Sequence, residues 1–154
     1  MWRNREAEKC FPRLARGDYN LTSHPDKTYN CVAWAVGDKT HFWYDAKIKG
    51  YYWPPGARSA DTIEGWKDVF EIHNYSVCAS REFESKFEKV AIYINAEGIP
   101  EHVARQTGDG MWSSKLGKGC DIEHDTLDVL EGDVYGKVGV IMQRQCKDGK
   151  RVNP

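Results

Sequence analysis

Two residues of this chain have the types and the order that thiol chemistry needs. Cys31 follows Asn30 in "TYNCVAWAVGD" and precedes a short apolar run that ends at Gly37. A cysteine attacks only as the thiolate, which the unpaired N–H groups at a helix start favour. A base must then take the proton, and among the five histidines His102 is placed best, since it opens a strand after the "EGIP" turn. The pair predicts nucleophilic attack by sulfur, with His102 as general base.

Each of these residues also has a structural interpretation. A free cysteine in an apolar helix is usually a small buried hydrophobe. The five cysteines are odd in number and contain no CxxC pair, so reduced thiols are expected rather than disulfides or a structural zinc site. A metal enzyme is a further alternative, and its ligands would be Cys31, His102, Cys120 and His124. Their spacing matches no zinc clip, and the thiol mechanism needs no metal or organic cofactor.

The elements that would carry the pair follow from local sequence. Asn30 can cap a short helix whose apolar side is residues 32–36, and a clearer helix runs from Asp61 to His73, where Asp61 and Glu64 resemble a capping box. Residues 1–28 are expected to be irregular. Strands are predicted over 88–95, 102–106, 111–117 and 135–145, and residues 121–132 are predicted to be a link with at least one helical turn.

Helices followed by strands joined through short turns predict a single α+β domain over residues 1–154, with an antiparallel sheet. His102, Ala104 and Gln106 would share one face of their strand. Ala104 is small, so we expect the helix that carries Cys31 to pack on that face.

Composition limits the classes of function. The net charge is −1 and the pI is about 6.5, so the sustained basic surface of a nucleic-acid or anionic-lipid binder is absent. The start "MWRNREAEKC" reaches no apolar signal region, and no stretch has the length of a membrane span. We therefore predict a cytoplasmic protein, with export by a dedicated secretion system as an alternative.

The segments "YNCVAWA" and "GIPEHVARQTGDGMWSSKLG" resemble the compact papain-like cysteine peptidases and amidases of the NlpC/P60 and CHAP type. The resemblance follows the order of elements from Tyr29 to Gly136, and its close matches are Asn30-Cys31 and His102-Val103 with the Gly108-Asp109-Gly110 turn. It implies a papain-like fold, with N-terminal helices packed on an antiparallel meander. It also implies a hydrolase or transferase that acts on an amide bond through an acyl-enzyme.

The resemblance implies partners as well. The substrate would be a peptide, a peptidoglycan stem or a protein side chain. If the protein is an antibacterial effector, an inhibitory or immunity protein would accompany it.

The third catalytic residue stays open. The resemblance favours Ser114, which an odd-residue turn at 108–110 places on the face of His102. The rivals are Ser113, Asp121 and His124. The backbone N–H of Cys31 would supply half of an oxyanion hole, and the candidates for the other donor are Tyr19, Asn20 and Asn30.

Aromatic and basic residues suggest a substrate surface. Flat rings with polar tips suit an extended peptide or a sugar, and the candidates are Trp43, Tyr51, Tyr52 and Trp53. Lys115, Lys118 and Arg105 would attract an acidic group such as a substrate carboxylate. The alternatives are an aromatic clamp over the core and ordinary solvated charges. A non-catalytic papain-like module that binds its partner through the aromatic groove is the main rival to the enzyme.

Overall fold

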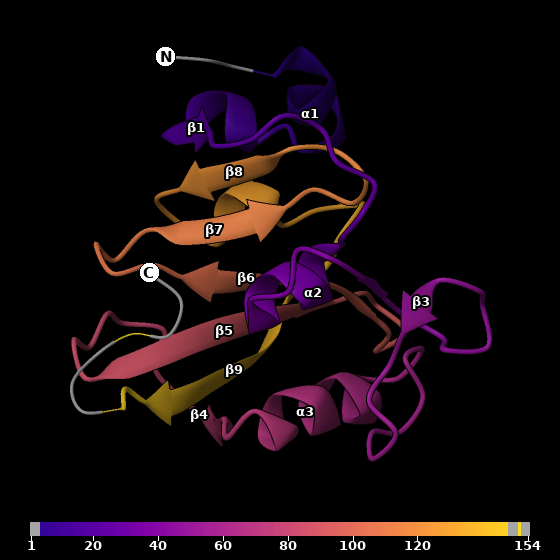
Figure 1. Ribbon diagram of the computed structural model, residues 1–154. Helices are drawn as coiled ribbons and strands as arrows, with labels where there is room; N and C mark the ends of the chain where they lie inside the picture. Colours follow the sequence, from indigo (N-terminus) through magenta and orange to yellow (C-terminus); the bar gives the residue numbers. More distant parts are fainter. Residues whose placement is uncertain (1–3, 148–150, 152–154) are drawn as a thin grey trace.

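A seven-stranded antiparallel sheet organises the protein. The computed structural model describes residues 4–147 and residue 151. The strand order is β1-β8-β7-β6-β5-β9-β4, so β5 to β8 form a meander and β9 returns to the other side of β5 (Figure 1). The strands are β1 (Tyr19–Leu21), β4 (Ser76–Cys78), β5 (Phe87–Ile94), β6 (Pro100–Gln106), β7 (Trp112–Lys115), β8 (Asp121–His124) and β9 (Lys137–Gln145).

Helical segments cover both faces of this sheet. The face in front in Figure 1 carries α2 (Cys31–Val36) and α3 (Ile63–Ile72), with a small parallel pair of strands, β2 (Phe42–Trp43) and β3 (Tyr51–Tyr52), at its edge. The opposite face packs against segments from both ends of the chain, namely α1 (Arg5–Cys10) and the 3-10 turns η1 (Leu14–Arg16) and η2 (Asp128–Leu130). The described chain is therefore an α+β fold in three layers.

Side-chain alternation along the central strands divides the core into two clusters. Val90 and Ile92 of β5 pack with Val103 of β6 under α2 and α3. Ala91 and Tyr93 point the opposite way and pack with the second cluster, which holds Phe11, Leu14, Ala104, Trp112, Ile122, Leu130 and Ile141. Because β5 is covered on both faces, it is apolar at every position from Val90 to Ile94 instead of alternating.

Several expectations from sequence are confirmed. Asn30 caps α2 through the Ala33 N–H, and Gly37 ends the helix in a left-handed conformation with φ of 93°. The helix expected over 61–73 is α3, although its cap is Thr62, whose side chain accepts from the Gly65 N–H, and not the Asp61–Glu64 pair. The strands predicted around 88–95, 102–106, 111–117 and 135–145 are β5, β6, β7 and β9.

Two expectations were wrong. The segment 1–28 is not irregular in its described part, since it contains α1, η1 and β1, and β1 pairs with β8 at the edge of the sheet. The link expected over 121–132 begins with a strand, β8, and only its second half forms the helical turn η2. Each error includes a strand of only three or four residues: β1, at the edge of the sheet, pairs with the distant β8, and β8 lies between β1 and β7.

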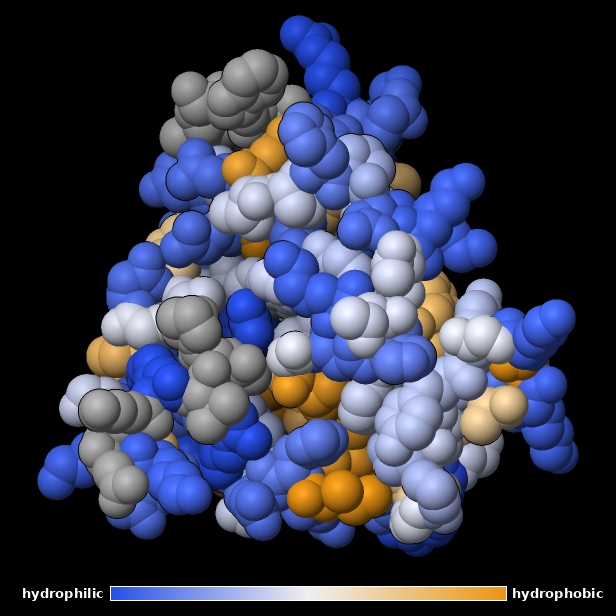
Figure 2. All heavy atoms as spheres, viewed as in Figure 1, coloured by the Kyte–Doolittle hydropathy of each residue, from blue (hydrophilic) through white to orange (hydrophobic). Residues whose placement is uncertain are grey.

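The surface is largely polar. Figure 2 shows hydrophilic residues over most of the face in view, with hydrophobic residues visible mainly in the region of α3. No helix in the described ranges is long and apolar enough to cross a membrane.

Candidate functional site

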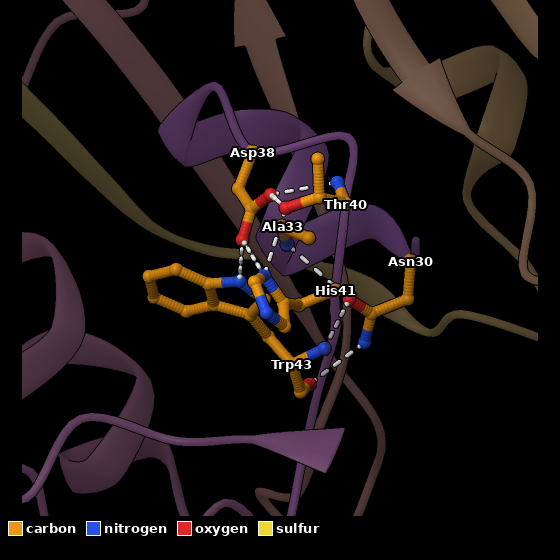
Figure 3. Close-up of polar contacts among 6 residues, drawn as sticks. All are labelled: Asn30, Ala33, Asp38, Thr40, His41 and Trp43. Atoms are coloured by element: carbon orange, nitrogen blue, oxygen red, sulfur yellow. Dashed lines mark hydrogen bonds and ion pairs between the residues drawn. The ribbon is translucent and has the colours of Figure 1, made fainter. Parts of the chain in front are cut away.

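The start of α2 is held by the side chain of Asn30. Its Oδ1 accepts from the N–H groups of Ala33 and Trp43, at 3.3 and 3.0 Å, and its Nδ2 donates to the Trp43 carbonyl at 2.8 Å. Figure 3 shows the amide lying between the first turn of α2 and the backbone of β2. Asn30 was predicted to support an oxyanion. In the structure its amide instead joins the helix to the neighbouring strand.

Replacing this side chain is expected to destabilise the protein. Asn30→Ala removes a helix cap and leaves both backbone groups of Trp43 without their partner, so we expect a loss of about 2 kcal/mol of unfolding free energy. Asn30→Asp keeps the acceptor but loses the donor, so its loss should be smaller. Urea unfolding of the two variants checks this. Equal stability of Asn30→Ala and the unaltered protein would contradict the capping role.

Cys31 lies at the first position of α2, as expected, but its sulfur is enclosed. The residue is 8% exposed and belongs to the core cluster that contains Val103. Burial raises the pKa of the Cys31 thiol to about 11 and outweighs the backbone N–H groups of Val103 and of the helix start, which favour the thiolate. At neutral pH this thiol is protonated.

His102 lies on the opposite face of the sheet. It stands across from Tyr93, and its ring stacks on Tyr135 with centroids 4.2 Å apart, whereas its neighbour Val103 stands across from Ile92 under α2. The expectation that α2 covers the face of Ala104 was therefore wrong, because α2 packs on the larger apolar surface of Ile92 and Val103. Neither ring nitrogen of His102 has a hydrogen-bond partner among the described residues. Burial, and then the nearby His124, hold the pKa of His102 well below its usual value.

Among the described residues, no candidate for a third catalytic residue forms a hydrogen bond to His102. Ser114 shares the face of His102, as predicted, but its hydroxyl bonds to Nε2 of His124 at 2.8 Å. Nδ1 of His124 donates to the Thr126 carbonyl, so Nε2 is the acceptor. Ser113 lies on the α2 face, where its Oγ accepts from Nε1 of Trp34 at 2.9 Å. Neither serine orients His102.

The four residues considered as metal ligands are not brought together. Cys31 packs in the first core cluster and Cys120 in the second, on the other side of the sheet. Within residues 4–147 and 151, no three or more His, Cys, Asp or Glu side chains form a group that could hold a metal ion.

The aromatic segment does not form the expected groove. Trp43 and Trp53 are buried, and their indole N–H groups donate to Asp38 and to the Arg58 carbonyl, each at 2.7 Å. Figure 3 shows Asp38 also bonded to Thr40 and His41, so this corner is fixed internally. Only Tyr52 is substantially exposed, at 39%. The alternative of an aromatic clamp over the core describes Trp43 and Trp53 correctly.

Lys115 was predicted to attract substrate from the surface. In the structure it is fully buried, and its ammonium donates to the carbonyls of Gly117 and Gly119 at 2.7 and 2.6 Å. Its role is therefore to close the turn between β7 and β8.

A polar pocket of about 450 Å³ lies beside α2, on the same face of the sheet as Cys31. Its walls come from α2, from the β6–β7 hairpin, from β8 and from the segment after β1. The charged residues are Lys39, Arg105, Asp109, Asp121 and Glu123, and the uncharged ones include Thr22, Ser23, Trp34, Thr107 and Ser113. Its volume falls in the range of small-ligand sites. Of the basic residues of this pocket, Arg105 had been predicted from the sequence to attract an acidic group of the substrate.

Arg105 is the main cation of this pocket. Its guanidinium carbon lies 4.1 Å from the centroid of the Trp34 ring, and Nη1 donates to the Trp34 carbonyl at 3.4 Å. Its Nε is buried and has no hydrogen-bond partner, and none of the ion pairs among the described residues includes Arg105. Lys39 lies 5.4 Å from the same ring. A permanently charged guanidinium is thus neutralised by no carboxylate in direct contact.

Acidic groups line the rest of the pocket. Asp121 is 2% exposed, and its Oδ2 accepts from the Tyr29 hydroxyl at 2.9 Å. Burial raises the pKa of the Asp121 carboxyl more than Tyr29 and Lys115 lower it. Burial, and then the adjacent Asp109 carboxyl, raise the pKa of Glu123. These groups and Arg105 give one cavity both signs of charge.

Comparison with known proteins identifies one family. A family model described as a domain of unknown function, DUF7689, matches residues 20–143, which include the whole pocket as well as Cys31 and His102. No curated protein and no solved structure gives a significant match. Because the family model matches most of the sequence, the chain belongs to the DUF7689 family.

Proposed function

We propose that this domain binds a small molecule that carries a carboxylate, in the pocket between α2 and strands β6 to β8. The observation that carries the proposal is Arg105, a charged side chain in the pocket wall whose Nε is buried with no hydrogen-bond partner in residues 4–147 or 151. A buried donor left unpaired costs about 1–3 kcal/mol, so an acceptor that reaches it gains correspondingly.

Neighbouring groups complete an anion site around Arg105. Trp34 holds the guanidinium plane by stacking, which leaves its donors at the edge available for a planar carboxylate. Ser113 accepts from the Trp34 indole, so its own hydroxyl hydrogen is available to donate. Lys39 adds a second positive charge at the same wall.

A carboxylate suits this pocket better than a phosphate. Asp109, Asp121 and Glu123 line the same cavity as Arg105 and Lys39. Like charges in a partly desolvated cavity repel strongly, and the repulsion grows with the charge of the ligand. A singly charged group is therefore favoured over a dianion.

Calorimetric titration with N-acetylglycine and with its uncharged amide tests this function. We expect the acid to bind and the amide to bind about 10- to 100-fold more weakly, because a hydrogen bond to a charged group contributes about 1.5–3 kcal/mol. Arg105→Gln should lower the affinity for the acid to the affinity measured for the amide. The matched control is Arg58→Gln, which removes an exposed arginine paired with Asp68. Equal binding of acid and amide, or full binding by Arg105→Gln, would refute the proposal.

A second candidate is a papain-like thiol hydrolase or transferase that uses Cys31 on an amide bond of a peptide or peptidoglycan stem. One observation favours it. The pocket includes Trp34, which lies three residues after Cys31 and therefore about one turn along the same side of α2. An acyl group in the pocket would reach the start of this helix. The mechanism requires ionisation of a thiol whose pKa is about 11, so it needs a change around the sulfur.

An electrophilic peptide amide discriminates between the two candidates. Labelling of Cys31 in the folded protein, mapped by mass spectrometry and lost in Cys31→Ala, would support the hydrolase. Cys10 is the control, because it is exposed at the end of α1 and lies outside the pocket. Labelling of Cys10 alone would leave the binding function as the better account.

A further inference from the structure

We infer that the ligand is a zwitterion of the amino-acid type, whose carboxylate meets Arg105 and whose ammonium meets Asp121. This inference rests on the proposed function and adds the second half of the ligand. Both residues line the same pocket. Asp121 is 2% exposed, its Oδ2 is taken by the Tyr29 hydroxyl, and its Oδ1 is buried with no hydrogen-bond partner among the described residues.

Lys115 acts on Asp121 through its charge but forms no direct ion pair with it. Lys115 stands directly across from it in the β7–β8 pairing, and its ammonium is turned to the carbonyls of Gly117 and Gly119. No ion pair joins the two side chains within the described part of the chain. A buried carboxylate oxygen without a donor is costly, so a ligand ammonium at this place would satisfy it.

The remaining acids of the pocket are less suited to hold an ammonium. Asp109 and Glu123 interact with one another, and the pKa of Glu123 is raised while that of Asp109 is lowered, first by the Thr107 hydroxyl. The Asp109 carboxylate already accepts from the Thr107 hydroxyl and the Met111 N–H. Oδ1 of Asp121 is therefore a buried carboxylate oxygen at the pocket with no donor among the described residues.

Charge pairing within one cavity argues for a ligand with both groups. A plain carboxylate would satisfy Arg105 but would add repulsion with Asp121, and a plain amine would do the reverse. A molecule that carries both charges satisfies both walls. The cavity of about 450 Å³ is large enough for an amino acid or a short peptide end.

Titration calorimetry with matched pairs tests the inference. The pairs are glycine with acetate, β-alanine with propionate, and 4-aminobutyrate with butyrate, so each zwitterion differs from its acid by one ammonium group. We expect at least one zwitterion to bind about 10-fold or more tightly than its matched acid, since the added hydrogen bond is charge-assisted. The length of that zwitterion reports the separation of the two anchors.

Asp121→Asn provides the decisive variant. It keeps the acceptor for Tyr29 and removes the charge. The affinity for the zwitterion should therefore fall to the affinity for its matched acid, while the affinity for the acid stays equal or increases. Retained acid binding also shows that the variant is folded. Asp133→Asn, at an exposed carboxylate outside this pocket, should change the affinity for neither ligand.

The outcomes separate the two proposals. Acids that bind through Arg105 with no gain from the ammonium would refute the zwitterion and leave carboxylate binding intact. Zwitterions that bind equally well to Asp121→Asn would also refute it. If neither N-acetylglycine nor any member of the three pairs binds, both proposals fail.

Discussion

Acidification from pH 6.5 to pH 4 is expected to lower the free energy of unfolding through two buried histidines, by about 3 kcal/mol for His124 and in the same direction for His102. Both are completely buried. Burial lowers the pKa of His124 to about 4 and that of His102 well below its usual value. The folded protein therefore keeps both imidazoles neutral near pH 6.5, and His124 takes up its proton only near pH 4.

The direction follows from proton binding by the two states. Above pH 6.5 neither state holds the proton, so the contribution of the histidines to stability is fully present. Below that pH each histidine binds a proton in the unfolded chain but stays neutral in the folded protein. The free energy of unfolding then falls by about 1.4 kcal/mol per pH unit for each histidine in this state. The fall from His124 ends near pH 4, where the folded protein also takes its proton. Asp121, whose carboxyl pKa is raised, acts in the opposite direction towards the acid end.

Urea unfolding at half-unit pH steps measures this slope. His102→Phe keeps a ring against Tyr135 and removes two unpaired nitrogens, so the protein should fold and lose about half of the slope. The control is His24→Phe, because His24 is exposed. A stability that is constant from pH 6.5 to 4, or an unchanged slope in His102→Phe, would show that the imidazoles are not held neutral.

Iodoacetamide is expected to label Cys31 at least 100-fold more slowly than an ordinary thiol at pH 7.5. Burial raises the pKa of Cys31 to about 11, and an ordinary thiol titrates about two units lower, so the thiolate is roughly 100-fold scarcer. The enclosure of the sulfur slows the reaction further. Because only the thiolate reacts, the rate should rise about tenfold with each pH unit up to pH 10.

Exposed Cys10 provides an internal reference, and the urea-unfolded protein provides the rate of Cys31 itself without the fold. Mass spectrometry of peptides after timed quenching gives both rates. If Cys31 in the folded protein reacts faster than Cys10 at pH 6, the thiol is activated, and the cysteine hydrolase becomes the better proposal.

Local sequence was sufficient for α2, α3 and β5. Asn30 and Gly37 bound α2 as predicted, because a side-chain acceptor at a helix start and a left-handed glycine at its end act over only three or four residues. The hydrophobic spacing of α3 and the apolar run of β5 are equally local. The short strands β1 and β8 were missed, since β1 pairs with residues about one hundred positions away and β8 is only four residues long.

The candidate site was predicted only in fragments. The sequence indicated that Arg105 could attract a carboxylate, and it placed Ser114 on the face of His102. It did not indicate Trp34, Lys39 or Ser113 as parts of one pocket, because these residues come from a helix, the loop after it and a strand. Asp121 was considered as a catalytic partner. In the structure its carboxyl accepts a hydrogen bond from the Tyr29 hydroxyl, and the residue lines the pocket.

The sequence by itself determined that Cys31 begins a helix and that His102 and Val103 point to opposite sides of their strand. Only the tertiary structure decided which of these two sides α2 covers. Strand alternation has a period of two and is the same for either choice, whereas the docking of α2 depends on the apolar surface that β5 and β6 present together. Ile92 and Val103 form that surface, so the helix brings Cys31 to Val103, and His102 stacks on Tyr135 behind the sheet.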